Sequence, residues 1–318
     1  MNALRENVTD YLAMRRTMGF KVEGLHKLLL SFVEFCEERG ATTHVRNDLA
    51  VQWATTRIKV PVSDALVARR LDAVRIFARY QHALDPTTQI PAQDIRPRRY
   101  RPKQPNVFSQ ADILALMAAT DTLTPSFKAL TWRTLIGLLA ATGIRPGEAC
   151  RLAVSDINLA NGVIQILQTK FGKSRLVFIH PSTATVISDY LQARQAWVGA
   201  TAHASPAVFV NTRRAALCPA RLNVTFRQIT CAAGLSTGPG RRPARLYDLR
   251  HTFTVTTMID WYRDGQDVQA RLPVLSTWLG HVDPASTYWY LHAVPELLTL
   301  AVDRLDIAAG GATTEPTP

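Results

Sequence analysis

Two arginines stand where a positive charge needs an anionic partner. Arg145 lies in a tight junction that contains glycine and proline, TGIRPGE (142–148), between two apolar stretches. Arg250 lies among apolar residues such as Leu249 and Phe253, at the expected start of a half-buried helix. A guanidinium binds a carboxylate or a phosphate through two parallel hydrogen bonds. Each arginine alone could pair with a structural acid, whereas the two together could bind the non-bridging oxygens of one phosphate.

These arginines belong to a longer series of polar residues in a fixed order. From the N-terminus the series is Arg145, Lys170, Arg250-His251, Leu279-Gly280-His281 and Tyr290. The order resembles that of the tyrosine recombinases, the phage-integrase family. The strings ATGIRPGEACRL, RLYDLRHTF and WLGHVDPASTYWYLH are similar to the motifs of this family. The similarity covers about residues 107–305 and, more loosely, the N-terminal part of the chain.

The resemblance implies that Tyr290 is a nucleophile. It would attack a DNA phosphodiester and leave a 3′-phosphotyrosyl enzyme and a free 5′-hydroxyl. A phenol with a pKa of about 10 is a poor nucleophile until its proton is removed and the phosphate charge is screened. Arg145 and Arg250 would stabilise the charge that grows in the transition state. His281 would donate a further hydrogen bond or help to take the phenol proton.

The same resemblance gives the leaving oxygen a general acid. Lys170, near the tip of an expected hairpin, would protonate the departing 5′-oxygen, and Lys173 is the alternative for that role. Glu148 matches the family's acid after the first arginine and would support the site. Because the phosphotyrosine ester conserves the free energy of the broken bond, rejoining would need no ATP, cofactor or metal.

Two positions need a choice. Tyr288 lies close to Tyr290, but the spacing from His281 and the following Leu291-His292 favour Tyr290 as the nucleophile. The two histidines adjacent to assigned residues, His251 and His292, are interpreted as structural.

One residue departs from the family pattern. Three residues before the second arginine the family usually has histidine or lysine, and here the residue is Tyr247. A phenol can donate a hydrogen bond to phosphate, but it is neutral and a weak acid at pH 7. Tyr247 is therefore included among the catalytic candidates with its role in doubt.

The first hundred residues predict helices. Val22, Leu25, Leu29, Phe32 and Cys36 form one apolar stripe, and Val67, Leu71, Val74 and Ala78 form a second one behind a cap at Ser63 or Asp64. Four arginines share the second segment and are candidates for DNA binding, although a solvated helix face is an equal alternative: Arg69, Arg70, Arg75 and Arg79.

A basic linker follows these helices. Residues 89–106 contain four prolines and no apolar period, so they predict an extended tether. Its cations are candidates for phosphate contacts: Arg96, Arg98, Arg99, Arg101 and Lys103. Basic residues outnumber acidic ones by 18 to 11 up to Lys103 and by 19 to 14 after it. Both parts of the chain could therefore close on a polyanion.

The remaining sequence predicts mostly helices with one hairpin. Ser109 and Asp112 resemble a capping box, and an apolar helix is expected over 127–141. The β-rich runs 163–167 and 175–179 flank a polar turn and predict a hairpin.

The basic loop 236–243 contains Arg241 and Arg242, which are further candidates for DNA binding. Residues 263–273 are expected to form an inserted loop, as in recombinases borne by transposons. The helix that begins at Pro295 is expected to dock into a neighbouring protomer.

Composition excludes several classes of protein. The chain has 318 residues, 47% hydrophobic, and a net charge of +12, which favours nucleic acid as the partner. The four cysteines, far apart in the sequence, indicate neither a disulfide framework nor a zinc site. We expect no metal, no membrane span and no signal peptide. The expected location is the bacterial cytoplasm, at the nucleoid.

These observations predict a mainly α fold with a small β-hairpin or sheet, in which a helical core-binding domain and a recombinase catalytic domain form a C-shaped DNA clamp. The expected domains are residues 1–88, the linker 89–106, the catalytic domain 107–307 and a flexible tail, 308–318. The expected function is site-specific recombination of double-stranded DNA through a Holliday junction, for integration, excision or transposition. The protein would act as a tetramer on paired sites or together with related recombinases. The alternatives are a weakened DNA-binding accessory protein and strand swivelling like that of type IB topoisomerases.

Overall fold

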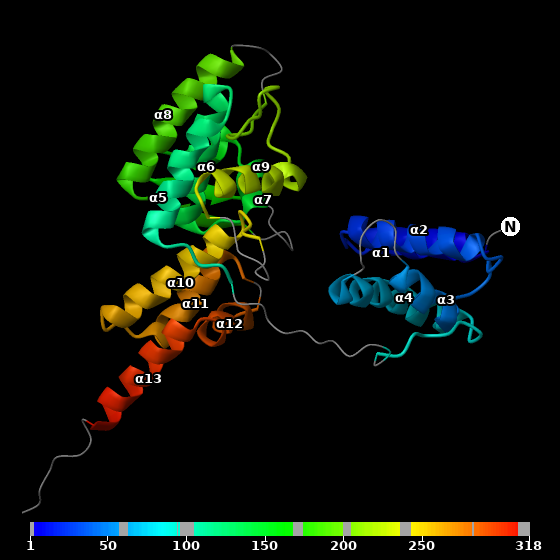
Figure 1. The fold of residues 1–318 in the computed structure, drawn as a ribbon. Coiled ribbons are helices and arrows are strands. Elements are labelled where there is room, and N and C mark those ends of the chain that lie inside the picture. The colour runs from blue at the N-terminus through cyan, green and yellow to red at the C-terminus, as the bar shows by residue number, and fades with distance from the viewer. Residues whose placement is uncertain are drawn as a thin grey trace, which may run out of the picture. The chain divides into compact units, whose positions relative to one another are not determined.

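The chain folds as two compact units, residues 1–102 and 103–318 (Figure 1). The computed structural model describes residues 3–56, 63–93, 95, 105–167, 174–199, 205–235, 243–281 and 283–310. Each unit encloses hydrophobic core residues of its own.

The first unit is helical throughout its described elements. They are α1 (Ala3–Thr17), α2 (Glu23–Glu37), α3 (Asn47–Thr55) and α4 (Asp64–Leu84). The two predicted apolar stripes are confirmed, because their residues on α2 and α4, together with Val22 just before α2, pack into one core with only Leu25 partly exposed. Ser63 caps α4 as predicted, since its side chain accepts a hydrogen bond from the backbone N–H of Leu66.

The second unit combines helices with a short sheet. Its helices are α5 (Gln110–Ala119), α6 (Ser126–Thr142), α7 (Pro146–Arg151), α8 (Pro181–Val198), α9 (Pro219–Ala232), α10 (Asp248–Arg263), α11 (Val268–Leu279), α12 (Ala285–Ala293) and α13 (Pro295–Gly310), with 3₁₀ turns at Thr120–Thr122 and Val154–Asp156. The capping box at Ser109 and Asp112 is present. It begins α5 at Gln110.

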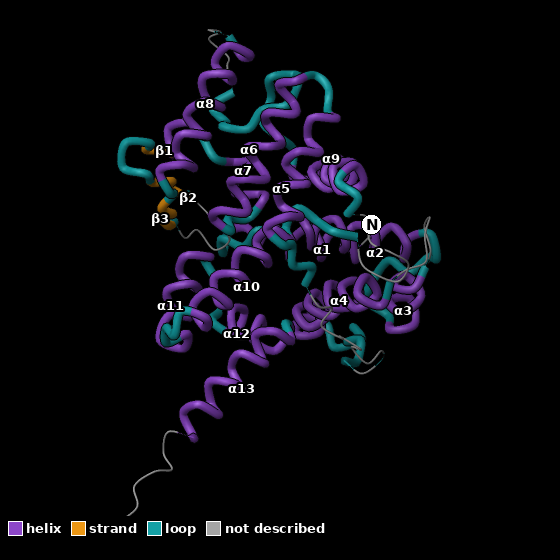
Figure 2. The backbone as a smooth tube through the Cα atoms, turned by 60° about the vertical axis from the view of Figure 1, so that its left-hand side comes forward, coloured by secondary structure: helices purple, strands orange, loops and turns teal. Residues whose placement is uncertain are grey.

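The predicted hairpin is confirmed and gains a third strand. The strands β1 (Ile157–Asn158), β2 (Val163–Ile166) and β3 (Arg175–Phe178) form an antiparallel sheet in the order β1-β2-β3. Ile164 of β2 lies opposite Val177 of β3, and both side chains are buried. Figure 2 shows these strands in orange at one edge of the unit. This sheet holds β3 against α11.

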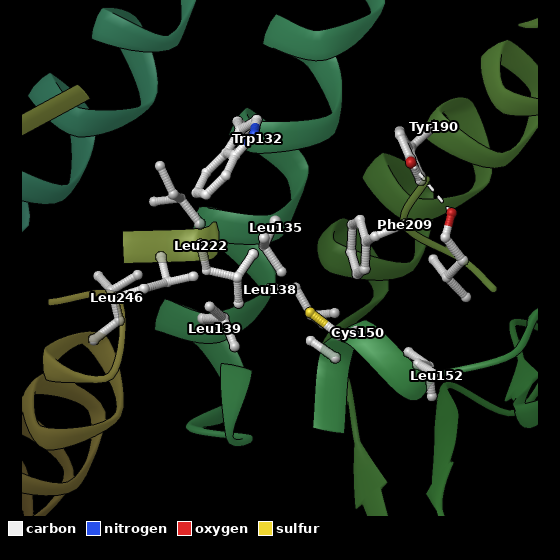
Figure 3. Close-up of a cluster of buried hydrophobic side chains, with 14 of the residues drawn as sticks. Trp132, Leu135, Leu138, Leu139, Cys150, Leu152, Tyr190, Phe209, Leu222 and Leu246 are labelled. Atoms are coloured by element: carbon white, nitrogen blue, oxygen red, sulfur yellow. Dashed lines mark hydrogen bonds between the residues drawn. The ribbon is translucent and has the colours of Figure 1, made fainter. Parts of the chain in front are cut away.

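Helix α6 forms the centre of the larger core. Its leucines lie among side chains of neighbouring elements, including Cys150 of α7, Leu222 of α9 and Phe209 (Figure 3). The strongly apolar composition of α6 explains this burial on most of its faces. Since α6 is fixed on several sides, its C-terminal end at Thr142 gives the following junction a defined position.

The prediction of a loop over residues 263–273 is wrong for residues 268–273, which are helical. The chain leaves α10 at Arg263 and re-enters a helix at Val268, where Asp267 accepts a hydrogen bond from the backbone N–H of Ala270. Pro273 lies inside α11. It stands in the middle of the helix and removes one backbone hydrogen bond there, while buried Leu272 and Leu275 beside it hold the helix on the core.

Helix α13 packs on its own chain at its start and extends further than expected. Leu297 is fully buried, while Leu298 and Val302 are exposed. Arg304 donates a hydrogen bond to the carbonyl oxygen of Gly265 at 3.0 Å. The helix continues through Gly310, three residues into the expected tail.

Candidate active site

Arg145 begins α7 and is held there by its own helix. It is the N-cap residue, and the Glu148 carboxylate accepts a hydrogen bond from the backbone N–H of Arg145 at 2.9 Å. Its guanidinium donates to Glu148 Oε1 at 2.7 Å and to the carbonyl oxygen of Gly280 at 2.8 Å. The side chain remains 25% exposed. Arg145 therefore has a structural acid partner, and its side chain is still partly open to solvent.

Arg250 is fully buried without an acid partner among the described residues. Its Nη1 and Nη2 donate to the carbonyl oxygens of Gly143 and Leu279, at 2.8 and 2.7 Å. These carbonyls lie at the C-terminal ends of α6 and α11, where unpaired carbonyl groups and the helix dipole favour a cation. Burial lowers the pKa of Arg250 to about 10, so the group is still charged at pH 7. Its Nε is buried and has no hydrogen-bond partner in the part of the chain that the structure describes.

Two glycines allow the helix ends to approach these arginines. Gly143 and Gly280 end α6 and α11 in the left-handed conformation, with φ of 64° and 67°. A Cβ at position 143 would lie 2.4 Å from the ring of Phe253. A Cβ at position 280 would lie 2.9 Å from the guanidinium of Arg175. Both positions therefore require glycine for conformation and for space.

The Glu148 carboxylate is enclosed by two arginines. In addition to Arg145, Arg175 of β3 donates to both carboxylate oxygens, at 3.2 and 2.7 Å. Arg175 Nε also donates to the carbonyl oxygen of Trp278, at 2.7 Å. Burial opposes ionisation of Glu148, but the hydrogen bonds and charge of Arg175, followed by those of Arg145, lower its pKa to about 2. The ionised Glu148 thus connects α7 to β3, and its two arginine partners connect both to the end of α11.

Arg175 was not anticipated from the sequence. As the first residue of a β-rich run it has the same pattern as a solvent-facing strand residue. Only the pairing of β3 beside α11 brings it to Glu148. The sequence feature that could have indicated its role is a cation at the start of an otherwise apolar strand.

Tyr290 lies on α12, buried to 3% exposure, and its hydroxyl contacts a histidine. The phenol oxygen is 2.7 Å from Nδ1 of His251 on α10. Burial and the neighbouring Tyr247 raise the pKa of Tyr290 to about 12, although the nearby Arg250 and Arg145 act in the opposite direction. Tyr288 is 43% exposed. Tyr290 is thus buried within reach of the charges of both arginines, whereas Tyr288 is exposed.

His251 lies among aromatic rings. Its ring centroid is 5.0 Å from that of Tyr247, 5.5 Å from that of Tyr290 and 6.0 Å from that of Trp289. Tyr247, at the start of α10, is 37% exposed. The interpretation of His251 as a purely structural residue did not foresee its contact with Tyr290. The sequence feature that could have indicated this contact is the position of His251 directly after Arg250, on the same helix.

His281 follows Gly280 directly and is held by Thr287. Its Nδ1 lies 2.7 Å from Oγ1 of Thr287. Burial and the charges of Arg250, Arg145 and Arg175 lower the pKa of His281 to about 4. The imidazole is therefore neutral at pH 7 and can donate or accept a hydrogen bond.

Several predicted site residues lie outside the described residues. They are the hairpin lysines Lys170 and Lys173, the linker cations Arg96, Arg98, Arg99, Arg101 and Lys103, and the loop arginines Arg241 and Arg242. The side chain of His292 is also outside the described part.

The arginines of α4 divide into two kinds. Arg70 is buried and donates to the carbonyl oxygens of Trp53, Ala54 and Thr56 at the end of α3. Arg75 is buried too and donates to carbonyl oxygens of the segment after α4 and to Asp72. This placement corrects the prediction that these two arginines face DNA, because both complete the fold of their own unit. Arg69 and Arg79 are exposed.

Neither a metal cluster nor a membrane helix is found in the described ranges. No group of three or more His, Cys, Asp or Glu side chains there could hold a metal ion. No helix there is both long and apolar enough to cross a membrane.

Known proteins are similar to this chain in sequence and in fold. A model of the phage integrase family matches residues 106–296, more than half of the chain. The chain belongs to the phage integrase family. It is a tyrosine recombinase, and the matches favour site-specific recombination over the alternatives considered from the sequence.

Relatives of this recombinase match it almost from end to end. A protein of Sinorhizobium fredii named as an integrase/recombinase, y4rB, is 38% identical over 96% of this chain and 98% of its own length. The tyrosine recombinase XerC of Lactobacillus delbrueckii subsp. bulgaricus is 26% identical over 93% of this chain and 96% of its own. The Tn1549 transposon integrase, solved in complex with transposon right end DNA, shares the fold. It has a TM-score of 0.67 at 14% identity and covers 96% of this chain and 100% of that one.

Proposed function

We propose that this recombinase cleaves double-stranded DNA by transferring a strand to Tyr290 and rejoins it by the reverse transfer. The observation that carries the proposal is the meeting of four distant segments at one place. Arg145 and Arg250 donate to the carbonyls of Gly280 and Leu279. His281 follows these carbonyls directly, and the charges of both arginines act on Tyr290.

The arginines would bind the scissile phosphate. A guanidinium carries five N–H donors, so the carbonyl contacts of Arg145 and Arg250 leave donors for phosphate oxygens. Arg145 is partly open to solvent. Arg250 is fully covered, so a phosphate would reach it only after neighbouring side chains shift. In the transition state both charges, with a hydrogen bond from His281, would offset the growing negative charge.

Lys170 would protonate the 5′-oxygen as it leaves, with Lys173 as the alternative. Both assignments come from the family resemblance. The products, a phosphotyrosine ester and a 5′-hydroxyl, keep the bond energy for rejoining. The cycle as proposed therefore uses neither ATP nor a metal ion.

DNA would be contacted by both units of the chain and by the linker. The proposed contacts are Arg69, Arg79, Arg96, Arg98, Arg99, Arg101, Lys103, Lys173, Arg241 and Arg242. Four protomers, or this chain with related recombinases, would assemble on paired sites as a clamp around each duplex. The exposed Leu298 and Val302 of α13 would contact the neighbouring protomer.

We further propose a role in the movement of a mobile element. The similarity to the transposon integrase and the relation to y4rB support this class of role. Since its substrate would be chromosomal DNA, the protein would act at the nucleoid in the cytoplasm.

The decisive experiment uses Tyr290→Phe. This variant is first used to select a binding sequence from random duplexes. A nicked duplex with that sequence is then incubated with the wild type, Tyr290→Phe and Tyr288→Phe. We expect a covalent protein–DNA adduct with the wild type and Tyr288→Phe, and none with Tyr290→Phe despite near-normal binding. An adduct that persists in Tyr290→Phe and maps to another residue would overturn the assignment.

A further inference from the structure

The hydrogen bond between His251 and Tyr290 has no part in the reaction as proposed above. Nδ1 of His251 lies 2.7 Å from the phenol oxygen. When the imidazole proton is on Nε2, the lone pair of Nδ1 accepts this bond and the phenol O–H donates it. The contact then joins a basic nitrogen to the proton that must leave before the phenol can attack.

Tyr290 needs such a base. Its pKa is raised to about 12, first by burial and then by Tyr247. At pH 7 a phenol with that pKa is ionised in roughly one molecule in 10⁵. An arginine or a bound phosphate can change this fraction, but neither takes up the proton.

Other described groups near Tyr290 are less suited to this task. Tyr247 occupies the position at which the family usually has histidine or lysine, and a neutral phenol is a very poor proton acceptor. His281 has its Nδ1 engaged with Thr287. His251 is the described histidine with a ring nitrogen within hydrogen-bond distance of the nucleophile.

We propose that His251 is the general base of strand cleavage, taking the Tyr290 proton on Nδ1 through the hydrogen bond seen in the structure. The proposal rests on the proposed function of Tyr290. As the bond from the phenol oxygen to phosphorus forms, the bond from phosphorus to the 5′-oxygen breaks. The phenol proton moves to His251, and the 5′-oxygen takes a proton from Lys170. Rejoining reverses both transfers, so the imidazolium returns its proton to Tyr290.

The surroundings hold the imidazole in the orientation that this transfer requires. Tyr247 packs edge-on against it from the start of the same helix, and Trp289 lies on the side of α12. Among the described residues, the titratable groups that contact it or act on it are Tyr247 at the start of α10, Tyr290 of α12 and His281 after α11. In this arrangement Tyr247 acts by packing, which accounts for a neutral residue at that position.

The test separates hydrogen bonding from proton transfer. In His251→Asn the amide oxygen replaces Nδ1 as a hydrogen-bond acceptor but cannot take a proton. The rate of adduct formation is measured on the nicked duplex selected with Tyr290→Phe. We expect a loss of roughly 10²-fold or more at neutral pH, the usual contribution of a general base. The exposed His180, bonded to Ser182 at the start of α8, supplies the control variant His180→Asn, which should react at the wild-type rate.

The pH profile gives a readout that a structural role would not move. The wild-type rate should reach a plateau once the imidazole is neutral. The rate of His251→Asn should keep rising with pH, because solvent must then remove the phenol proton. In His251→Ala, added imidazole should restore the reaction in proportion to its neutral form. Urea unfolding and DNA binding, measured on each variant, identify any variant that has lost its fold.

A second substrate distinguishes the role of His251 as general base from that of Lys170 as general acid. A 5′-bridging sulfur leaves without protonation, so it should rescue Lys170→Ala and not His251→Asn. The inference is overturned if folded His251→Asn reacts at the wild-type rate with the wild-type pH profile. It is also overturned if the sulfur substrate rescues that variant. Failure of the proposed function is distinct, because the wild type itself would then form no adduct at Tyr290.

Discussion

At the scale of single residues, the charge of Glu148 holds the site together. Its side chain is nearly inaccessible, and two arginines from different segments share its oxygens. Removing one partner of a buried ion pair leaves the other charge buried without compensation. We therefore expect Glu148→Gln to lower the free energy of unfolding by about 3 kcal/mol at pH 7, as measured by urea denaturation.

The effect of Glu148→Gln should depend on pH. Because folding lowers the pKa of this carboxyl from 4.5 to about 2, its contribution is complete above pH 4.5 and is lost as the pH falls towards 2. The difference between wild type and variant should shrink over that range. Glu296→Gln is the control, since its ion pair with Arg263 is exposed and should matter little. Equal losses in the two variants would contradict the importance of burial.

His281 provides a second prediction about a single residue. Its pKa of about 4 lies below the ordinary value of 6.5, so the unfolded chain binds this proton first. Stability should fall as the pH drops from 6.5 towards 4. NMR titration of the imidazole, assigned with His281→Gln, should give a midpoint near 4, and added duplex DNA should raise it because a phosphate favours imidazolium. A midpoint near 6.5 without DNA would show that the side chain is solvated.

Sequence patterns predicted several residues that the structure brings together in the candidate site, but they could not give the partners of these residues. Arg145, Arg250, His281 and Tyr290 come together as the family motifs imply. Arg70 has no sequence feature that separates it from the exposed Arg69, because what buries it is the end of α3. His251 acquires its contact with Tyr290 only when the fold brings α10 and α12 together. Arg175 acquires its contacts through the packing of β3 beside α11. Such contacts depend on tertiary structure and leave no local period in the chain.

At the scale of elements, the site depends on how α6 ends. Gly143→Ala places a methyl group against Phe253 and a non-glycine residue at positive φ. We expect a loss of about 3 kcal/mol in the free energy of unfolding, of which about 1 comes from the backbone. Gly265→Ala is the matched control, with φ of 71° and open space around its Cβ, and should show only the backbone part. Chemical denaturation of both variants checks the comparison, and equal losses would show that Phe253 moves aside freely.

The elements themselves were largely predictable. The apolar stripes of α2 and α4, the caps at Ser63 and Ser109, and the pairing of β2 with β3 all follow local rules of spacing and capping. Helix α11 was missed in part because Pro273 and a polar Asp267 resemble loop residues. In the folded chain Asp267 caps the helix, and apolar burial outweighs the cost of proline.

At the scale of the whole molecule, the linker predicts a strong dependence of DNA binding on salt. Each phosphate contact releases about one counterion, so log Kd against log salt concentration has a slope close to the number of contacts. Replacing Arg98, Arg99 and Arg101 by glutamine should reduce this slope by about three. Fluorescence anisotropy at several salt concentrations measures it. An unchanged slope would mean that the linker does not reach the DNA backbone.

Arg250 donates hydrogen bonds to carbonyl oxygens at the ends of α6 and α11. These bonds affect how this enzyme can lose activity through mutation. Replacing Arg250 would leave two carbonyl groups unpaired inside the protein, so the inactive product would also be prone to misfolding and degradation. Replacing Tyr290 by phenylalanine removes a single hydroxyl and leaves those carbonyls satisfied. If Tyr290 is the nucleophile as proposed, inactive descendants that persist as intact proteins should therefore arise more often by changes at Tyr290 than at this arginine.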